Sequence, residues 1–316
     1  MATSGSVDFS VNRDQIIRAA MEAARAIGAG ESISAEDQSL CELQLNLLVK
    51  QWQGDNDFAP GMKVWSRKRA TLFLQKDTHQ YSLGPSGDHW TSSYVRTTLS
   101  ADESAASTAI DVTSTTGMTV GDYIGIVLDD DTIHWSTISA IPSTVTIAAG
   151  LASGASSGNY VYTYTTKARR PISLVTLARR SVDSSSETQD SPMYMLDLHQ
   201  YEAITNKTSQ GTPTGAYYEA TLTDGTLYLD REPANVDSQL RIVYLSPIED
   251  FDSTTDTPDY PQEYYSALVY ELAIRICVPF QLPITPELKM VRDDAMAIAR
   301  NLYPENTTAY FQPGLD

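Results

Sequence analysis

The spacing of apolar residues changes twice along this chain, and that change limits the fold more than any other feature. Near both ends the apolar residues recur at helical spacing, which is typical of helices that cover a core with one face. From Lys63 to Leu245 they alternate with polar residues, which is typical of strands. The sequence therefore predicts an α+β protein with a helical bundle from N- and C-terminal helices, a central antiparallel β region and an inserted small β-sandwich or barrel domain.

Four helices are predicted, and capping residues mark where three of them begin. Asn12, with Gln15 three residues later, forms a capping box, and Ser34 is a second N-cap. Thr285 caps the last helix, with Pro286 in its first turn. The predicted helices cover residues 12–28, 34–53, 261–278 and 285–303.

The second predicted helix has more apolar surface than one contact requires. One stripe along it consists of Leu40, Leu43 and Leu47. The other stripe consists of Cys41, Leu45, Leu48 and Trp52. Because a helix that is apolar on two sides must be covered on two sides, the stripe of Cys41, Leu45, Leu48 and Trp52 is predicted to contact a neighbouring subunit.

Residues 97–166 differ sharply in composition from the chain on either side. They contain seven Asp and Glu residues but no Lys or Arg. Alternating residues predict five short strands, at 110–112, 123–128, 133–138, 145–147 and 160–164. We therefore expect a main body in residues 1–96 and 167–302, an inserted β domain in residues 97–166 and an extended tail in residues 303–316, which holds Tyr303, Tyr310 and Phe311.

The net charge limits the partners of the chain. With 22 Lys and Arg against 40 Asp and Glu, the formal charge is −18, which argues against a protein that grips nucleic acid over its whole surface. Two basic clusters stand out: Lys63, Arg67, Lys68 and Arg69, and then Lys167, Arg169, Arg170, Arg179 and Arg180. They fit contact with DNA or an acidic partner, and they equally fit strand-edge protection or salt bridges within the chain.

The termini and cysteines indicate where the protein is made. No secretory signal opens the sequence, and no run of about 18 apolar residues predicts a membrane span. Cys41 and Cys277 lie in apolar helical patterns and are predicted to be buried free thiols. No cofactor or metal is expected, and we expect a soluble protein made in the cytoplasm.

Three local patterns invite a chemical interpretation. Asp129, Asp130 and Asp131 precede His134, but their spacing is not that of a calcium loop, so a solvated turn is the simpler prediction. Glu249 and Asp252 offer a carboxylate pair for glycan hydrolysis. Aromatic residues of the insertion offer a sugar-stacking surface, with ordinary cross-strand packing as the alternative. These aromatic residues are Tyr123, Trp135, Tyr160, Tyr162 and Tyr164.

Short motifs in a fixed order resemble a known family. They are Arg13 to Ile17, Gly30-Glu31, Ser34 to Asp37, Leu45 to Gln53, Arg170-Pro171, Tyr201 to Lys207, Gly211 to Pro213, Leu227 to Leu229 with Pro233, Ile248 to Phe251, and Tyr260 to Tyr264. In this order the chain resembles the head-to-tail adaptors of short-tailed bacteriophages, also called head-completion, packaged-DNA-stabilisation or tail tubular A-like proteins. The resemblance covers roughly residues 11–95 and 168–302.

This resemblance implies a structural protein without enzymatic activity. Such proteins form a ring, usually of twelve copies, beneath the portal protein at the head-tail junction of the virion. The ring extends the channel for double-stranded DNA, retains the packaged genome and docks the tail nozzle, and tail fibres or other tail proteins are further partners. It also implies that the tail docks on the portal, for which Tyr303, Tyr310 and Phe311 are the expected anchors. The alternative is a cell-wall glycan hydrolase of the tail machine that uses Glu249 and Asp252.

Overall fold

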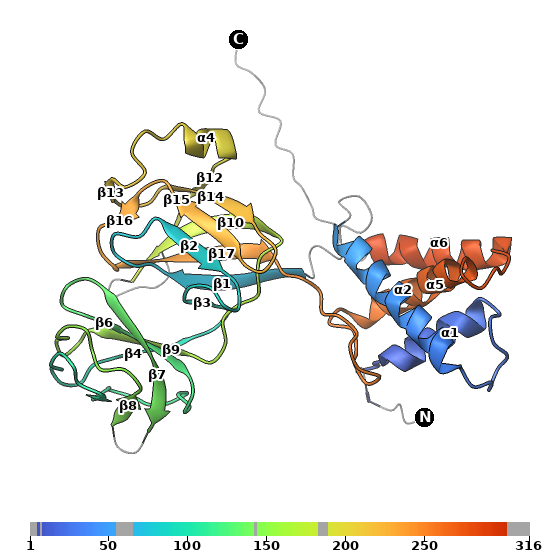
Figure 1. Cartoon of the computed structure of the whole chain (residues 1–316), viewed down its shortest axis with the longest axis horizontal. Helices are drawn as coiled ribbons and strands as arrows, with labels where there is room; N and C mark the ends of the chain where they lie inside the picture. Colours follow the sequence, from blue (N-terminus) through green and yellow to red (C-terminus); the bar gives the residue numbers. More distant parts are fainter. Residues whose placement is uncertain (1–4, 7, 55–65, 142–143, 183–188, 302–316) are drawn as a thin grey trace, which may run out of the picture. The chain divides into compact units, whose positions relative to one another are not determined.

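The computed structural model describes residues 5–6, 8–54, 66–141, 144–182 and 189–301, and the chain divides into two compact units. The helical unit comprises residues up to Ser66 and from Pro247 onward, and the β unit runs from Arg67 to Ser246. The chain therefore leaves the helical unit once and returns to it after the β unit is complete (Figure 1). Helices and antiparallel sheets are both present, so the predicted α+β class is confirmed.

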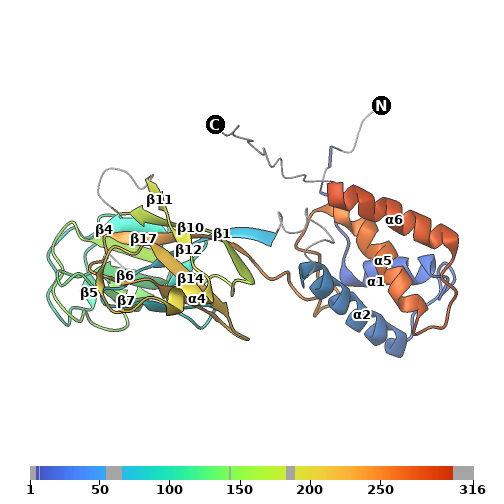
Figure 2. The same cartoon turned by 90° about the horizontal axis from the view of Figure 1, so that it is seen from above.

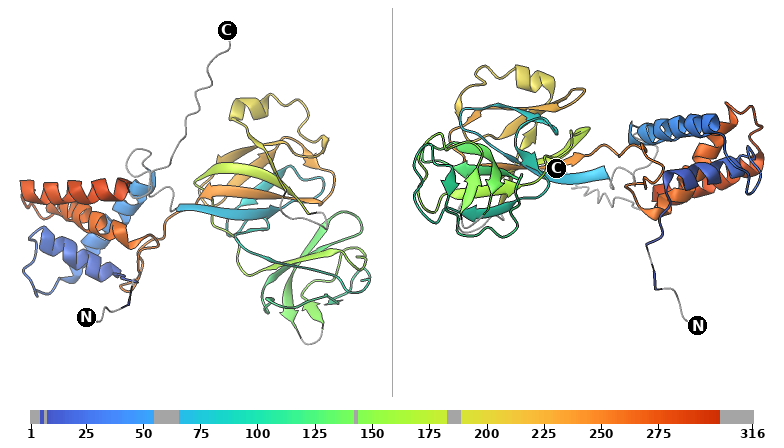
Figure 3. Two further views of the ribbon diagram at one scale, coloured as in Figure 1. Left: turned by 180° about the vertical axis from the view of Figure 1, so that it is seen from behind. Right: turned by 60° about the horizontal axis from the view of Figure 1, so that its bottom comes forward.

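The helical unit packs three helices around a fourth. Its elements are α1 (Arg13–Ala23), α2 (Ala35–Gly54), the 3-10 turn η1 (Gln262–Tyr264), α5 (Tyr265–Cys277) and α6 (Pro286–Asn301). The most apolar helix, α5, contacts each of the other three (Figure 2). Figure 3 shows the same packing from two further sides. Both cysteines are buried and free, as predicted.

The predicted caps of the helices are present. Asn12 and Gln15 form the capping box of α1. The Ser34 hydroxyl accepts a hydrogen bond from the Asp37 amide, with 3.1 Å between the two atoms. However, α1 ends at Ala23 rather than near residue 28. The reason is that Arg25 adopts a left-handed φ of 60° and the Ala26 amide donates to the Met21 carbonyl. These two features end the helix before Gly28 is reached.

Two sheets of the β unit enclose one core. The five-stranded sheet has the order β11 (Asp190–Pro192), β10 (Ser173–Ser181), β17 (Ser238–Leu245), β1 (Arg67–Phe73) and β3 (Trp90–Thr91). The four-stranded sheet has the order β12 (Tyr194–Met195), β14 (Gly215–Ala220), β15 (Gly225–Leu229) and β2 (Gln80–Leu83). A short pair, β13 (Gln210–Gly211) and β16 (Glu232–Pro233), and the helix α4 (Leu198–Glu202) complete this part.

Alternation along β17 shows how this core is built. Leu240, Ile242 and Tyr244 are buried in a cluster that also contains Leu227 and Leu229 of the opposite sheet. The intervening residues of β17 therefore lie on the outer face of the five-stranded sheet. The turn at Asp224 joins β14 and β15, which pair directly as an antiparallel hairpin.

Residues 95–164 form a sheet of their own within the β unit. Its order is β4 (Val95–Thr98), β9 (Tyr160–Tyr164), β6 (Tyr123–Val127), β7 (Ile133–Ala140), β8 (Val145–Ile147) and β5 (Ala109–Ile110). The five strands predicted from alternation are all present, and β4 is an additional one. An isolated bridge between Leu99 and Val112 joins the two edges, so the strands surround a separate apolar core. No described helix is long and apolar enough to cross a membrane.

Candidate functional site

The stripe of α2 that was predicted to contact a neighbouring subunit is buried within its own helical unit. Cys41, Leu45 and Leu48 are 0% exposed and Trp52 is 2% exposed, because they pack into the core of their own helical unit. The prediction that this stripe contacts a neighbouring subunit is therefore wrong. The physical reason is α5, which buries residues on most of its circumference and takes its cover from the larger stripe of α2.

Apolar side chains remain exposed on two helices of the helical unit. Leu43 and Leu47 of α2 are 55% and 50% exposed, and they lie one turn apart on the same face. On α6, Met290 and Ile298 are exposed, and Val291 is partly so. We call these five residues, which form separate patches on α2 and α6, the exposed apolar surface. Because each leucine is already about half buried, covering the rest of it stabilises an assembly by about 1 kcal/mol.

The predicted basic residues do not form one surface. Within β1, Arg67 and Arg69 alternate with Lys68, which pairs with the inward-facing Tyr244. Within β10, Arg180 lies on the outer face of the sheet, whereas Arg179 pairs with the core residue Leu240. Arg169 and Arg170 precede β10, and Lys63 lies outside the described residues. Arg67, Arg69 and Arg180 thus lie on the outer face, where Arg69 and Arg180 line one cavity, whereas Lys68 and Arg179 lie on the opposite face.

The outer face also carries an arginine that sequence analysis missed. Arg241 of β17 pairs with Thr71 on one side and Ala178 on the other, and so lies between β1 and β10. Its Nη1 donates to the Thr71 hydroxyl at 2.8 Å. Together with Arg69 and Arg180 it lines a cavity of about 330 Å³. The signal for it was available, because Arg241 alternates with Leu240 and Ile242 in a predicted strand.

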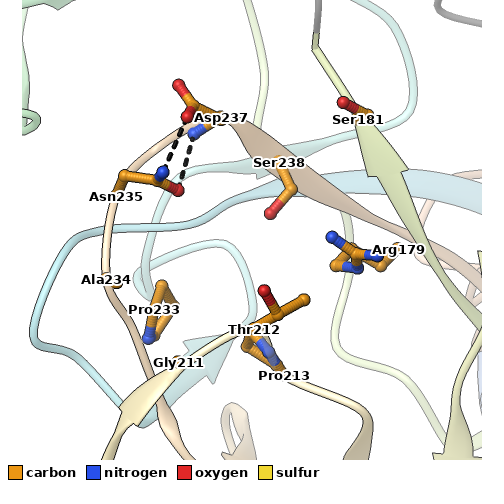
Figure 4. A pocket seen from close by; sticks show the side chains of 10 residues that line it. All are labelled: Arg179, Ser181, Gly211, Thr212, Pro213, Pro233, Ala234, Asn235, Asp237 and Ser238. Atoms are coloured by element: carbon orange, nitrogen blue, oxygen red, sulfur yellow. Dashed lines mark hydrogen bonds between the residues drawn. The ribbon is translucent and has the colours of Figure 1, made fainter.

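Arg179 lies instead in a separate pocket of about 260 Å³, at one end of the two-sheet core (Figure 4). Figure 4 shows its guanidinium directed into the pocket, toward the hydroxyl groups of Thr212 and Ser238. Gly211 to Pro213, one of the motifs that carry the resemblance, forms part of the wall. The carboxylate of Asp237 bonds to Asn235 at 2.6 Å and does not face Arg179.

Asp129, Asp130 and Asp131 follow β6, and Asp129 fixes a loop by hydrogen bonds. Asp129 accepts hydrogen bonds from the amide and hydroxyl of Ser156 at 2.9 and 3.0 Å and from the Asn159 side chain at 2.9 Å. These bonds lower the pKa of Asp129. The His134 ring lies 3.2 Å from the Ala149 carbonyl. Within the described residues no group of three His, Cys, Asp or Glu side chains is arranged to hold a metal.

The carboxylate pair considered for glycan hydrolysis lies in an exposed loop after β17. Glu249 and Asp252 are both exposed. The Asp252 amide donates to the Asp256 carboxylate at 2.8 Å, and Lys50 pairs with Asp250 at 2.5 Å. The neighbouring acids therefore hold the loop together, and none of these contacts favours catalysis. The hydrolase alternative stays a prediction without structural support.

Two of the five aromatic residues of the insertion, Tyr162 and Tyr164, are buried, and the other three are partly buried against them. Phe73 of β1 is 1% exposed, and its ring centroid lies 5.0 Å from that of Tyr162, 5.1 Å from Trp135 and 5.2 Å from Tyr94. Tyr164 is also buried in this group, which we call the aromatic cluster. It joins the six-stranded sheet to the outer face of the five-stranded sheet. These contacts favour the alternative of ordinary packing between strands, and the sugar-stacking interpretation stays a prediction.

His89 belongs to the same junction and is held in its neutral form. Its ring stacks on Trp135 with centroids 3.8 Å apart, and its Nδ1 lies 2.6 Å from the Tyr164 hydroxyl. Burial, and then the charge of Lys167, lower the pKa of His89 to about 3.

This pKa predicts a loss of stability in acid. Unfolded His89 takes up a proton near pH 6.5, whereas folded His89 does so only near pH 3, so the free energy of unfolding falls as pH decreases between these values. His89→Phe removes this proton uptake. Between pH 7 and pH 4 the wild type should lose about 1–2 kcal/mol more than His89→Phe, allowing for partial solvent exposure. Urea denaturation at both pH values measures the difference, and equal losses would contradict the neutral, buried His89.

The proposed portal anchors Tyr303, Tyr310 and Phe311 lie outside the described residues. Compared with the models of known protein families and with curated proteins, the chain gives no match.

Proposed function

We propose that this protein is a structural head-to-tail connector that forms a ring beneath a portal protein. The observation that carries the proposal is the exposed apolar surface on α2 and α6. The described part of the helical unit has an apolar core of its own, and these side chains do not belong to it. A neighbouring copy that covers them gains the burial that the isolated chain lacks.

The ordered motifs of the sequence support the same proposal. In this proposal, the helical unit is the bundle that closes the ring, and the six-stranded sheet is the inserted β-sandwich or barrel. The ring extends the DNA channel, retains the packaged genome and docks the tail nozzle at the head-tail junction of a virion. Its partners are further copies of the chain, the portal, the nozzle, other tail proteins and the DNA that passes through.

Charge opposes this assembly and makes it depend on salt. Each copy carries a formal charge of −18, so neighbouring copies in a ring repel one another. In this proposal the contacts between the helices of neighbouring copies are therefore mainly apolar, and the exposed apolar surface forms them. Because salt screens repulsion between exposed charges, assembly should strengthen as the salt concentration rises.

Leu43→Asp combined with Leu47→Asp tests the proposal. Both leucines are about half exposed, so the double variant should fold, while two buried carboxylates in each contact should prevent ring formation. The measurement is the mass of the assembly by light scattering, for the protein alone and with portal protein of the same virus. Leu222→Asp is the matched control, since Leu222 is 94% exposed on the hairpin of the β unit. If the double variant assembles as the wild type does, α2 does not form the contact.

A further inference from the structure

Strand register places three arginines on one diagonal of the outer face. Arg241 lies at the centre, level with Thr71 of β1 and Ala178 of β10. Arg69 lies level with Val243, two residues along β17 in one direction, and Arg180 lies level with Gln239, two residues in the other direction. Each arginine is therefore the diagonal neighbour of the next, at about 7–8 Å between backbones. This row of Arg69, Arg241 and Arg180 is called the arginine diagonal below.

The arginine diagonal carries more positive charge than its surroundings neutralise. Arg180 holds Asp190 by two bonds, at 2.7 and 2.8 Å. Arg241 donates to a neutral hydroxyl, and no described carboxylate pairs with Arg69. Among the described residues, three guanidinium groups thus face one carboxylate, which holds Arg180. The bond from Arg180 and the nearby charge of Arg241 lower the pKa of Asp190, as expected in a positive environment.

The position of the arginine diagonal keeps it accessible. The opposite face of the same strands is covered by the four-stranded sheet, and the aromatic cluster covers the end of the outer face at Phe73. Between them, the arginines line an open space of about 330 Å³ with Asp190 and Thr176. Arg69 is exposed, and Arg241 is half-buried. The row is therefore held in place by the sheet, yet its charged ends reach solvent.

We propose that the arginine diagonal binds successive phosphate groups of a double-stranded DNA backbone. The planar guanidinium group presents a fork of donors that matches phosphate oxygens. A row of three such groups on neighbouring strands suits a chain of anions better than one small ion. Base edges are not read, so binding is independent of sequence.

The inference rests on the proposed function in one respect, since the connector role is what brings DNA to the protein. It deepens that role by assigning the contact to one short row on a chain that is otherwise strongly acidic. A contact of about two phosphates is weak and depends on salt. Such a contact steadies DNA without preventing its movement.

The experiment measures binding of a fluorescein-labelled 30-base-pair DNA to the full-length protein by anisotropy, between 20 and 200 mM NaCl. We expect log K to fall with log salt with a slope of about −1.8, corresponding to two phosphates, because Asp190 already holds Arg180. Arg69→Gln combined with Arg241→Gln should weaken binding about tenfold or more at low salt and reduce the magnitude of the slope by about 2. Arg69→Lys combined with Arg241→Lys should keep most of the slope, because the charge remains.

Arg179→Gln is the matched control, since Arg179 is adjacent in sequence to Arg180 but lies in the pocket at the end of the two-sheet core. Its binding should equal that of the wild type. The proposal is overturned if DNA does not bind at 20 mM NaCl, if the Gln pair binds as the wild type does, or if poly-glutamate displaces DNA at equal charge concentration, which would indicate an acidic protein partner. Light scattering on the same samples reports ring formation separately, so failure of the connector role and failure of this site are distinguishable.

Discussion

Phe73→Ala should lower the free energy of unfolding of the β unit by about 3–5 kcal/mol. Phe73 is 1% exposed and is surrounded by rings from the six-stranded sheet, with centroids 5.0 Å from Tyr162 and 5.1 Å from Trp135. Its removal leaves a cavity where the two sheets meet, and rings fixed in separate strands cannot collapse into it. The loss should therefore lie at the upper end for a buried aromatic residue.

Urea denaturation of Phe73→Ala and Tyr194→Ala makes the comparison direct. Tyr194 is 75% exposed, so its replacement removes an aromatic ring without opening a core and should change stability by no more than about 0.5 kcal/mol. Hydrogen exchange should then accelerate in β6, β7 and β9 of the Phe73 variant. A change below about 1 kcal/mol for Phe73→Ala would contradict the packing of Phe73 between the five-stranded and six-stranded sheets.

Leu45→Ala should destabilise the helical unit by about 2–5 kcal/mol, whereas Leu47→Ala should change its stability by no more than about 0.5 kcal/mol. The two leucines are two residues apart on α2, but Leu45 is 0% exposed and Leu47 is 50% exposed. The deletion in each variant is identical, so the difference reports which side of the helix packs on α5.

Thermal unfolding followed by circular dichroism at 222 nm, with the protein kept dilute so that it does not assemble, measures this difference. If Leu47→Ala destabilises the unit more than Leu45→Ala does, Leu47 lies in the core and Leu45 lies outside it, at the subunit contact predicted for it from the sequence. Equal effects would mean that both sides of α2 are covered within one copy, which contradicts the exposed apolar surface.

Local signals in the sequence predicted the elements of the fold well. The capping box at Asn12, the cap at Ser34 and the five alternating stretches of the insertion each depend on residues within a few positions. Such signals act before any long-range contact forms. The early end of α1 was missed because it depends on Arg25 adopting a left-handed conformation. Gly28 and Gly30, which follow in the sequence, are the residues that more often end a helix in this way.

Long-range packing decided what the sequence left open. Both stripes of α2 have helical spacing, and only the position of α5 determines which of them is buried. The aromatic cluster joins Phe73 to Tyr162 and Tyr164, about 90 positions away, so spacing within one strand gave no sign of it. The arginine diagonal depends on the register of three strands from distant parts of the chain.

The connector proposal is tested most directly by cryo-electron microscopy of the full-length protein mixed with portal protein of the same virus. We expect a closed ring of about twelve copies on the portal, in which Leu43 and Leu47 are covered by the neighbouring copy. Single copies that leave the portal bare, at protein concentrations well above those in the light-scattering experiments, would contradict it.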